Sequence, residues 1–138
     1  MSQENVEIVR ARVAAWNAGD MESIRESSDP EIVVRPPLGW PEPGPFVGRE
    51  AVMREFEQLR ETWDVDTAER ISDFIDVGDR VAMRMRWRTA GRGPEANLEW
   101  TVVFTVRKGK VLNVEYFWGH AEALEAVGLS EQDAHADS

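Results

Sequence analysis

The run from Glu99 to Trp118 limits the possible folds more than any other part of the chain. Alternating apolar and polar residues on both sides of Lys108-Gly109 predict two strands, Leu98–Arg107 and Lys110–Trp118, joined by a tight hairpin turn. Because alternate side chains of a strand point to the same face, one face of this hairpin is predicted to collect large apolar groups around one acid. The side chains expected on that face are Trp100, Val102, Phe104, Asn113, Glu115 and Phe117.

The remaining periodic segments indicate an α+β domain. Helices are predicted at Gln3–Ala18, around Met21 and Ile24, at Arg49–Thr62 and at His120–Val127, and further strands at Glu31–Arg35, Asp66–Val77 and Arg80–Thr89. Short turns between the strands favour a curved antiparallel sheet wrapped around the helices, cone-shaped like an α+β barrel, with a cavity inside. We expect residues 1–129 to form a single domain and 130–138 to be an acidic, disordered tail.

Aromatic residues are the main candidates for the walls of that cavity. The chain has six tryptophans, a high count for 138 residues. Trp16 and Phe56 lie on apolar helical stripes with the spacing i, i+3, i+4, the second of which runs on to Trp63. Trp40 lies in a stiff loop from Pro36 to Pro45, which holds five of the seven prolines. Its ring either covers the pocket or fixes the loop to the body of the protein.

Composition excludes several classes of function. The formal net charge of −10 disfavours nucleic acid as a partner, since phosphate binding needs a basic face. No apolar run is long enough to cross a membrane, and the absence of cysteine fits a cytoplasmic protein. No metal-binding spacing, phosphate loop or dinucleotide signature is present, so we expect neither a metal nor a cofactor.

Several short motifs resemble the nuclear-transport-factor-two-like superfamily, in particular its SnoaL-like branch. They are AAWNAGD (14–20), VGREAV (47–52), GDRV (78–81), KGKV (108–111), EYF (115–117) and AEALEA (121–126). The resemblance covers nearly the whole chain, from Gln3 to Leu129. It implies the cone-shaped fold, but this fold hosts cyclases, isomerases, dehydratases, epoxide hydrolases and non-catalytic binders.

The resemblance to limonene epoxide hydrolase and SnoaL-like cyclases implies roles for two residues. Glu115 takes the place of their last-strand acid–base aspartate, and Arg86 that of the hydrolase arginine that braces it. Arg35, if it converges with Arg86 in one cavity, is expected to stabilise negative charge on the substrate. Arg88 stands where the hydrolase has a second aspartate, which departs from the epoxide-opening pattern. The alternative is a purely structural ion pair between Glu115 and Arg86.

The resemblance also implies which face of the strand Arg80–Thr89 is outside. If Arg86 faces the cavity, then Met83, Met85 and Trp87 make an apolar outer face, which a second copy of the chain would cover as a homodimer. The alternative inverts the faces, with methionines in the core and arginines in water. From periodicity alone the inverted arrangement is the more usual.

Two functions follow as hypotheses. The first is a cofactor-independent cyclase, isomerase or hydrolase that uses Glu115 as general acid–base on a small hydrophobic, oxygenated molecule. The second is a ligand-binding or structural dimer without chemistry. In both, we expect the cavity wall to consist of Trp16, Trp40, Phe56, Trp100, Val102, Phe104, Asn113 and Phe117.

Overall fold

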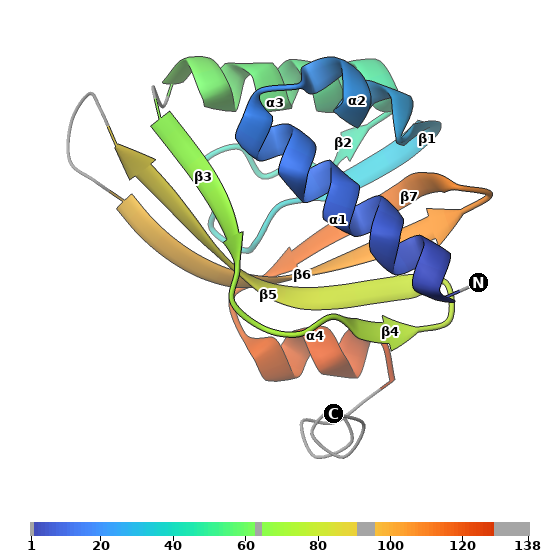
Figure 1. Ribbon diagram of the computed structural model, residues 1–138. Coiled ribbons are helices and arrows are strands. Elements are labelled where there is room, and N and C mark those ends of the chain that lie inside the picture. Colours follow the sequence, from blue (N-terminus) through green and yellow to red (C-terminus); the bar gives the residue numbers. More distant parts are fainter. Residues whose placement is uncertain (1, 63–64, 91–95, 129–138) are drawn as a thin grey trace.

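The computed structural model describes residues 2–62, 65–90 and 96–128 (Figure 1). Its helices are α1 (Ser2–Ala18), α2 (Met21–Glu26), α3 (Arg49–Thr62) and α4 (His120–Ala126). Its strands are β1 (Ser28–Arg35), β2 (Phe46–Val47), β3 (Val65–Arg70), β4 (Ile75–Val77), β5 (Arg80–Ala90), β6 (Ala96–Arg107) and β7 (Lys110–Phe117). Trp63, most of the turn before β6 and the predicted tail 130–138 lie outside the described residues, so the boundary at 129 stays a prediction.

The strands form one curved, open sheet, which confirms the α+β fold. Its order is β2-β1-β7-β6-β5-β3, and β4 also pairs with β5. Helices α1, α2 and α3 cover the inner face, whereas α4 lies on the outer face (Figure 1). The pairs are antiparallel except for β1 with β7, which is parallel. β1 and β7 can run parallel because a long stretch of chain, including α3 and the strands after it, connects them.

The segment Asp66–Val77, predicted as one strand, forms two strands in the structure. The prediction is therefore wrong for residues 71–74, which belong to neither strand. β3 ends at Arg70 and β4 begins at Ile75, and both pair with β5. Between them the Ser72 hydroxyl accepts a hydrogen bond from the Arg84 backbone N–H at 2.8 Å. A side chain thus takes the place of a strand carbonyl, and the ladder is interrupted there.

A β-bulge in β7 changes the predicted face of the hairpin. Next to the turn, Val106 pairs with Val111, but the next pair is Thr105 with Asn113, so Leu112 is one extra residue on β7. From there on, Glu115 lies opposite Val103 instead of Val102. One extra residue moves every later side chain to the other face. Asn113, Glu115 and Phe117 therefore do not share a face with Trp100, Val102 and Phe104, and that expectation is wrong.

The faces of β5 follow the inverted arrangement. Met83, Met85 and Trp87 are buried in the core on the inner face. On the outer face Arg86 pairs with Glu99 at 3.1 Å and with Glu69 at 3.7 Å. The apolar outer face from which a homodimer was inferred therefore does not exist on β5. The homodimer itself stays a prediction.

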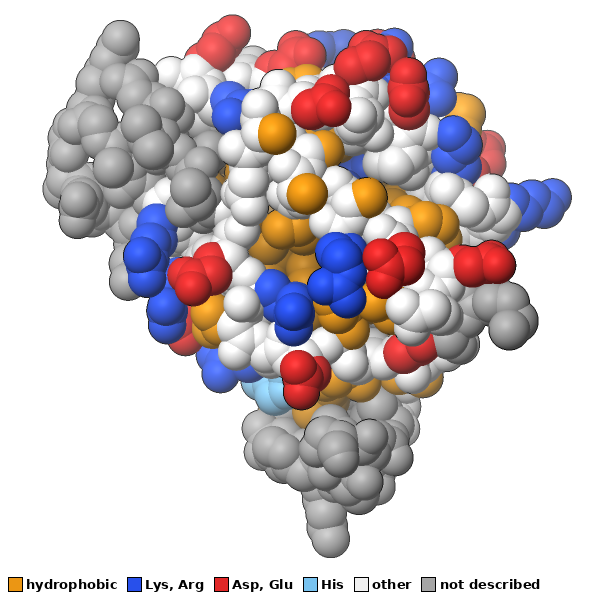
Figure 2. Space-filling model, in the orientation of Figure 1, with side chains coloured by type: hydrophobic (Ala, Val, Ile, Leu, Met, Phe, Trp, Pro, Cys, Tyr) orange, Lys and Arg blue, Asp and Glu red, His pale blue; other side chains and the backbone are white. Residues whose placement is uncertain are grey.

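Helix α4 covers part of the outer face. Ala123 and Val127 pack on Ala82 and Val103 in a small second cluster, which Phe117 also joins. None of the described helices is long and apolar enough to cross a membrane. On the surface, acidic side chains gather over α2 and α3 among basic ones (Figure 2). The sheet therefore has two distinct sides, an inner one facing three helices and an outer one that is largely polar.

Candidate functional site

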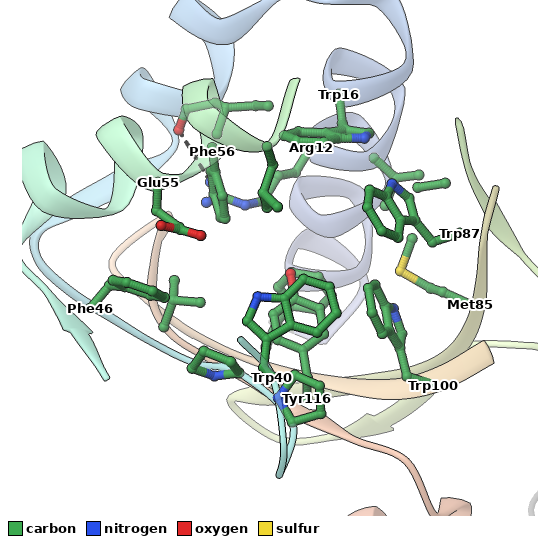
Figure 3. A pocket seen from close by; sticks show the side chains of 18 residues that line it. Arg12, Trp16, Trp40, Phe46, Glu55, Phe56, Met85, Trp87, Trp100 and Tyr116 are labelled. Atoms are coloured by element: carbon green, nitrogen blue, oxygen red, sulfur yellow. Dashed lines mark hydrogen bonds between the residues drawn. The ribbon is translucent and has the colours of Figure 1, made fainter. Parts of the chain in front are cut away.

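A cavity of about 120 Å³ lies between the inner face of the sheet, helices α1 and α3, and the proline-rich loop 36–45 (Figure 3). For comparison, an apolar cavity of about 150 Å³ holds benzene. The described residues that line it are Arg12, Val13, Trp16, Ile24, Val34, Pro36, Pro37, Trp40, Phe46, Glu55, Phe56, Leu59, Ala68, Met85, Trp87, Trp100, Phe104 and Tyr116. The predicted wall residues Trp16, Trp40, Phe56, Trp100 and Phe104 are among them.

Tryptophan rings form one wall of this cavity. Trp87 and Trp100 stack with their ring centroids 5.9 Å apart, and Trp40 packs against both, 6.2 Å from Trp87 and 5.8 Å from Trp100. Trp40 therefore fixes the proline loop to the body of the protein and lines the cavity as well. The loop is held a second time by Trp118, whose indole N–H donates to the Leu38 carbonyl at 2.8 Å.

Arg12 brings a buried positive charge to the cavity from α1. Its Nη1 donates to the Ile24 carbonyl at 3.1 Å and to the hydroxyls of Ser27 and Ser28 at 2.8 and 3.0 Å. Burial lowers the pKa of the guanidinium to about 10, so the group remains a cation at neutral pH. Nη2 is buried and has no hydrogen-bond partner among the described residues.

Tyr116 lines the cavity from β7. Its ring meets Trp100 edge-on at 5.1 Å, and in Figure 3 its hydroxyl points into the space below Arg12. Burial raises the pKa of the phenol, while the nearby Arg12 charge acts in the opposite direction. The phenol is therefore protonated at neutral pH and can donate a hydrogen bond to a guest.

Glu55 is the carboxyl group of the cavity. Its side chain is 8% exposed and points from α3 into the space between Phe46 and Phe56 (Figure 3). Burial, and then the charge and hydrogen bond of Glu42 in the proline loop, raise the pKa of Glu55 to about 7. Near neutral pH this carboxyl group can both accept and release a proton.

The sequence contained a signal for Arg12 and Glu55 that the predictions did not use. The apolar helical stripe of Trp16 also contains Val9 and Val13, and that of Phe56 also contains Val52. Each stripe also contains a charged residue three positions after a valine. Arg12 follows Val9 in this way, and Glu55 follows Val52. A charge at such a position faces the core, where it needs a partner or a function.

The predicted catalytic residues do not meet in this cavity. Glu115 is half-buried on the outer face, beside Arg35 in the parallel register and opposite Val103. Arg35 is exposed, and Arg86 pairs with Glu99 and Glu69 rather than with Glu115.

The other predicted wall residues have separate places. Val102 is fully buried in the core on the inner face. Asn113 pairs with Thr105, and Phe117 packs beneath α4. Among the residues that the structure describes, no group of three or more side chains of the metal-binding types lies close enough to hold a metal ion.

The arrangement can bind and protonate, or deprotonate, a small apolar molecule. Its walls are hydrophobic, its polar side chains are few, and one of them titrates near neutrality. Pockets with this composition are typical ligand sites.

Comparison with known proteins agrees with the fold. The profile of a family described as a SnoaL-like domain matches residues 9–114. The structure is similar to Bal32a from a soil-derived mobile gene cassette, with 25% identity, a TM-score of 0.77, and coverage of 83% of this chain and 88% of that one. A search of curated protein sequences finds no significant match.

Two further solved structures have the same fold at lower identity. TerC, co-crystallised with polyporic acid, is 23% identical, with a TM-score of 0.73 and coverage of 90% of this chain and 98% of that one. A proposed SnoaL-like polyketide cyclase from Jannaschia is 20% identical, with a TM-score of 0.72 and coverage of 84% and 85%.

Proposed function

Because the chain belongs to the SnoaL-like domain family, we propose that it binds a small hydrophobic, oxygen-bearing molecule in the cavity and exchanges a proton with it through Glu55. The proposed activity is that of a cofactor-independent acid–base enzyme of the cyclase, isomerase or hydrolase kind. Similarity to polyketide cyclase-like structures supports the small-molecule part of this proposal.

One observation carries the proposal of acid–base chemistry. Glu55 is a buried carboxyl group whose pKa lies at about 7, and it lines a cavity whose other walls are mainly apolar. A general base is most effective when its pKa lies near the working pH, and desolvation makes its carboxylate more reactive. Glu115, on the outer face, has no such surroundings, so Glu55 is the better candidate.

Binding can be tested without knowing the natural ligand. Indole N–H resonances report on the cavity, because Trp40, Trp87 and Trp100 all line it. We expect titration with benzamide, a compact neutral probe, to shift these three resonances while that of the half-exposed Trp118 moves less. Absence of any saturable shift would contradict ligand binding in this cavity.

Proton transfer can be tested with nitrobenzisoxazole, a compact aromatic probe of carboxylate bases. The base removes the proton from the ring carbon next to nitrogen, the N–O bond breaks, and a coloured cyanophenolate forms. We expect turnover to rise with pH through about 7, as Glu55 loses its proton.

Two matched variants separate the candidate bases. Glu55→Gln should lower the turnover of nitrobenzisoxazole by roughly a hundredfold or more, whereas Glu115→Gln should leave it unchanged. The opposite result would favour Glu115, and unchanged turnover in both variants would leave ligand binding without chemistry as the function.

A further inference from the structure

The polar atoms without partners in this cavity are hydrogen-bond donors. Arg12 Nη2 and Trp100 Nε1 are buried and have no partner among the described residues. The Tyr116 hydroxyl, protonated at neutral pH, adds a third donor on the same cavity wall as Trp100. Buried donors without partners are costly, so such a site favours a guest that supplies acceptor oxygens.

Arg12 further specifies the charge of the guest. Its side chain is 7% exposed, and every hydrogen bond that it makes within the described part of the chain goes to a neutral oxygen. The guanidinium of a buried arginine is normally paired with a carboxylate. Although acids are abundant in a chain with a net charge of −10, the hydrogen-bond acceptors of this cation in the described part of the chain are all neutral.

We propose that the cavity selects compact ring compounds that carry an anionic oxygen group, a carboxylate or an enolate, and that Arg12 binds this group. This inference rests on the proposed function, because it requires the cavity to be a binding site. In Figure 3 Arg12 reaches from α1 across the cavity toward Phe56 and Glu55, while Trp100 stands on the opposite side. The anionic group would lie against the guanidinium, and the ring against the tryptophan wall.

Glu55 fits such a guest when it is protonated. An anion beside it favours the neutral carboxylic acid, which then donates a hydrogen bond instead of repelling the guest. Glu42 interacts with this group from the loop, and Arg12 and Tyr116 are the other charged or titratable side chains that line the cavity. An anionic guest would therefore keep Glu55 protonated, and an oxygen of the guest could receive this proton.

The test compares benzoate with benzamide on the wild-type protein. The two probes have nearly the same shape and differ in charge, and the indole resonances of Trp40, Trp87 and Trp100 report on both. We expect benzoate to bind roughly tenfold or more tightly than benzamide, the range for a charge-assisted hydrogen bond. Equal or weaker binding of benzoate would overturn the inference while the proposed function stands. If neither probe binds, both fail.

Variants test the part played by Arg12. Arg12→Met should abolish the preference for benzoate and keep the binding of benzamide, whereas Arg54→Met, which removes an exposed charge on α3, should change neither. Because Arg12 also joins α1 to Ser27 and Ser28, Tyr116→Phe provides a second variant, which should weaken benzoate more than benzamide. A preference that persists in Arg12→Met and in Tyr116→Phe would overturn the assignment.

Discussion

Replacing Glu55 by glutamine should change how the stability of the protein depends on pH. The pKa of Glu55 is about 7 in the folded protein, against an ordinary value of 4.5. The folded state therefore holds this proton more tightly than the unfolded state. The contribution of Glu55 to stability is greatest below pH 4.5, falls as the pH rises toward 7, and then levels off, because the folded protein must bury a carboxylate.

The size of the effect follows from these two pKa values. At about 1.4 kcal/mol for each pKa unit, the difference between 7 and 4.5 corresponds to roughly 3 kcal/mol. The carboxyl group lies at a cavity wall near the exposed Glu42, so screening by water reduces this to about 2 kcal/mol. Glutamine has nearly the same shape and no charge. Glu55→Gln should therefore be more stable than the wild type at pH 8, by about 2 kcal/mol, and close to it at pH 4.5.

Urea denaturation of the wild type and of Glu55→Gln, each at pH 4.5 and pH 8, measures this difference. Glu115→Gln is the control for exchanging a carboxyl group for an amide outside the cavity, because Glu115 lies on the outer face. Glu42→Gln should remove part of the effect, since Glu42 contributes to the raised pKa of Glu55. Parallel pH profiles for the wild type and Glu55→Gln would refute the reasoning.

Two further predictions concern stability away from the acid. Leu124→Ala should cost about 2–5 kcal/mol, measured by urea denaturation, because Leu124 lies on the buried side of α4 and is fully buried. Benzamide should still shift the indole resonances of this variant, since α4 lies on the outer face. Gly44→Ala should cost about 1–3 kcal/mol and weaken benzamide binding, because φ is +60° and a Cβ would lie 2.9 Å from Pro36 Cδ. An unchanged melting temperature for either variant would contradict the packing described.

The sequence predicted the elements well because their signals are local. The turn at Lys108-Gly109 lies where it was expected, and both residues have positive φ, 53° and 78°. The helix predicted at Arg49–Thr62 has those bounds in the structure. The faces of β7 could not be predicted, because they depend on one extra residue at Leu112 that alternation does not reveal.

The acid was misplaced for the same reason. A regular ladder from the hairpin turn would have set Glu115 opposite Val102, on the inner face, and the family resemblance implied the same face for Arg86. In the structure β5 has the inverted arrangement that periodicity favoured, with Arg86 on the outer face. Because of the bulge, Glu115 also lies on the outer face. The contact between Glu42 and Glu55 joins a loop to a helix, and no local pattern in the sequence links the two.

The loop from Pro36 to Pro45 gives the cavity a wall that is independent of the sheet. Pro36, Pro37 and Trp40 line the space, yet none of them belongs to a strand. Substitutions in this loop can reshape the guest site without shifting any strand register. Mutational libraries confined to this loop, with Gly44 kept, would thus change what the protein accepts while leaving the framework that keeps it folded.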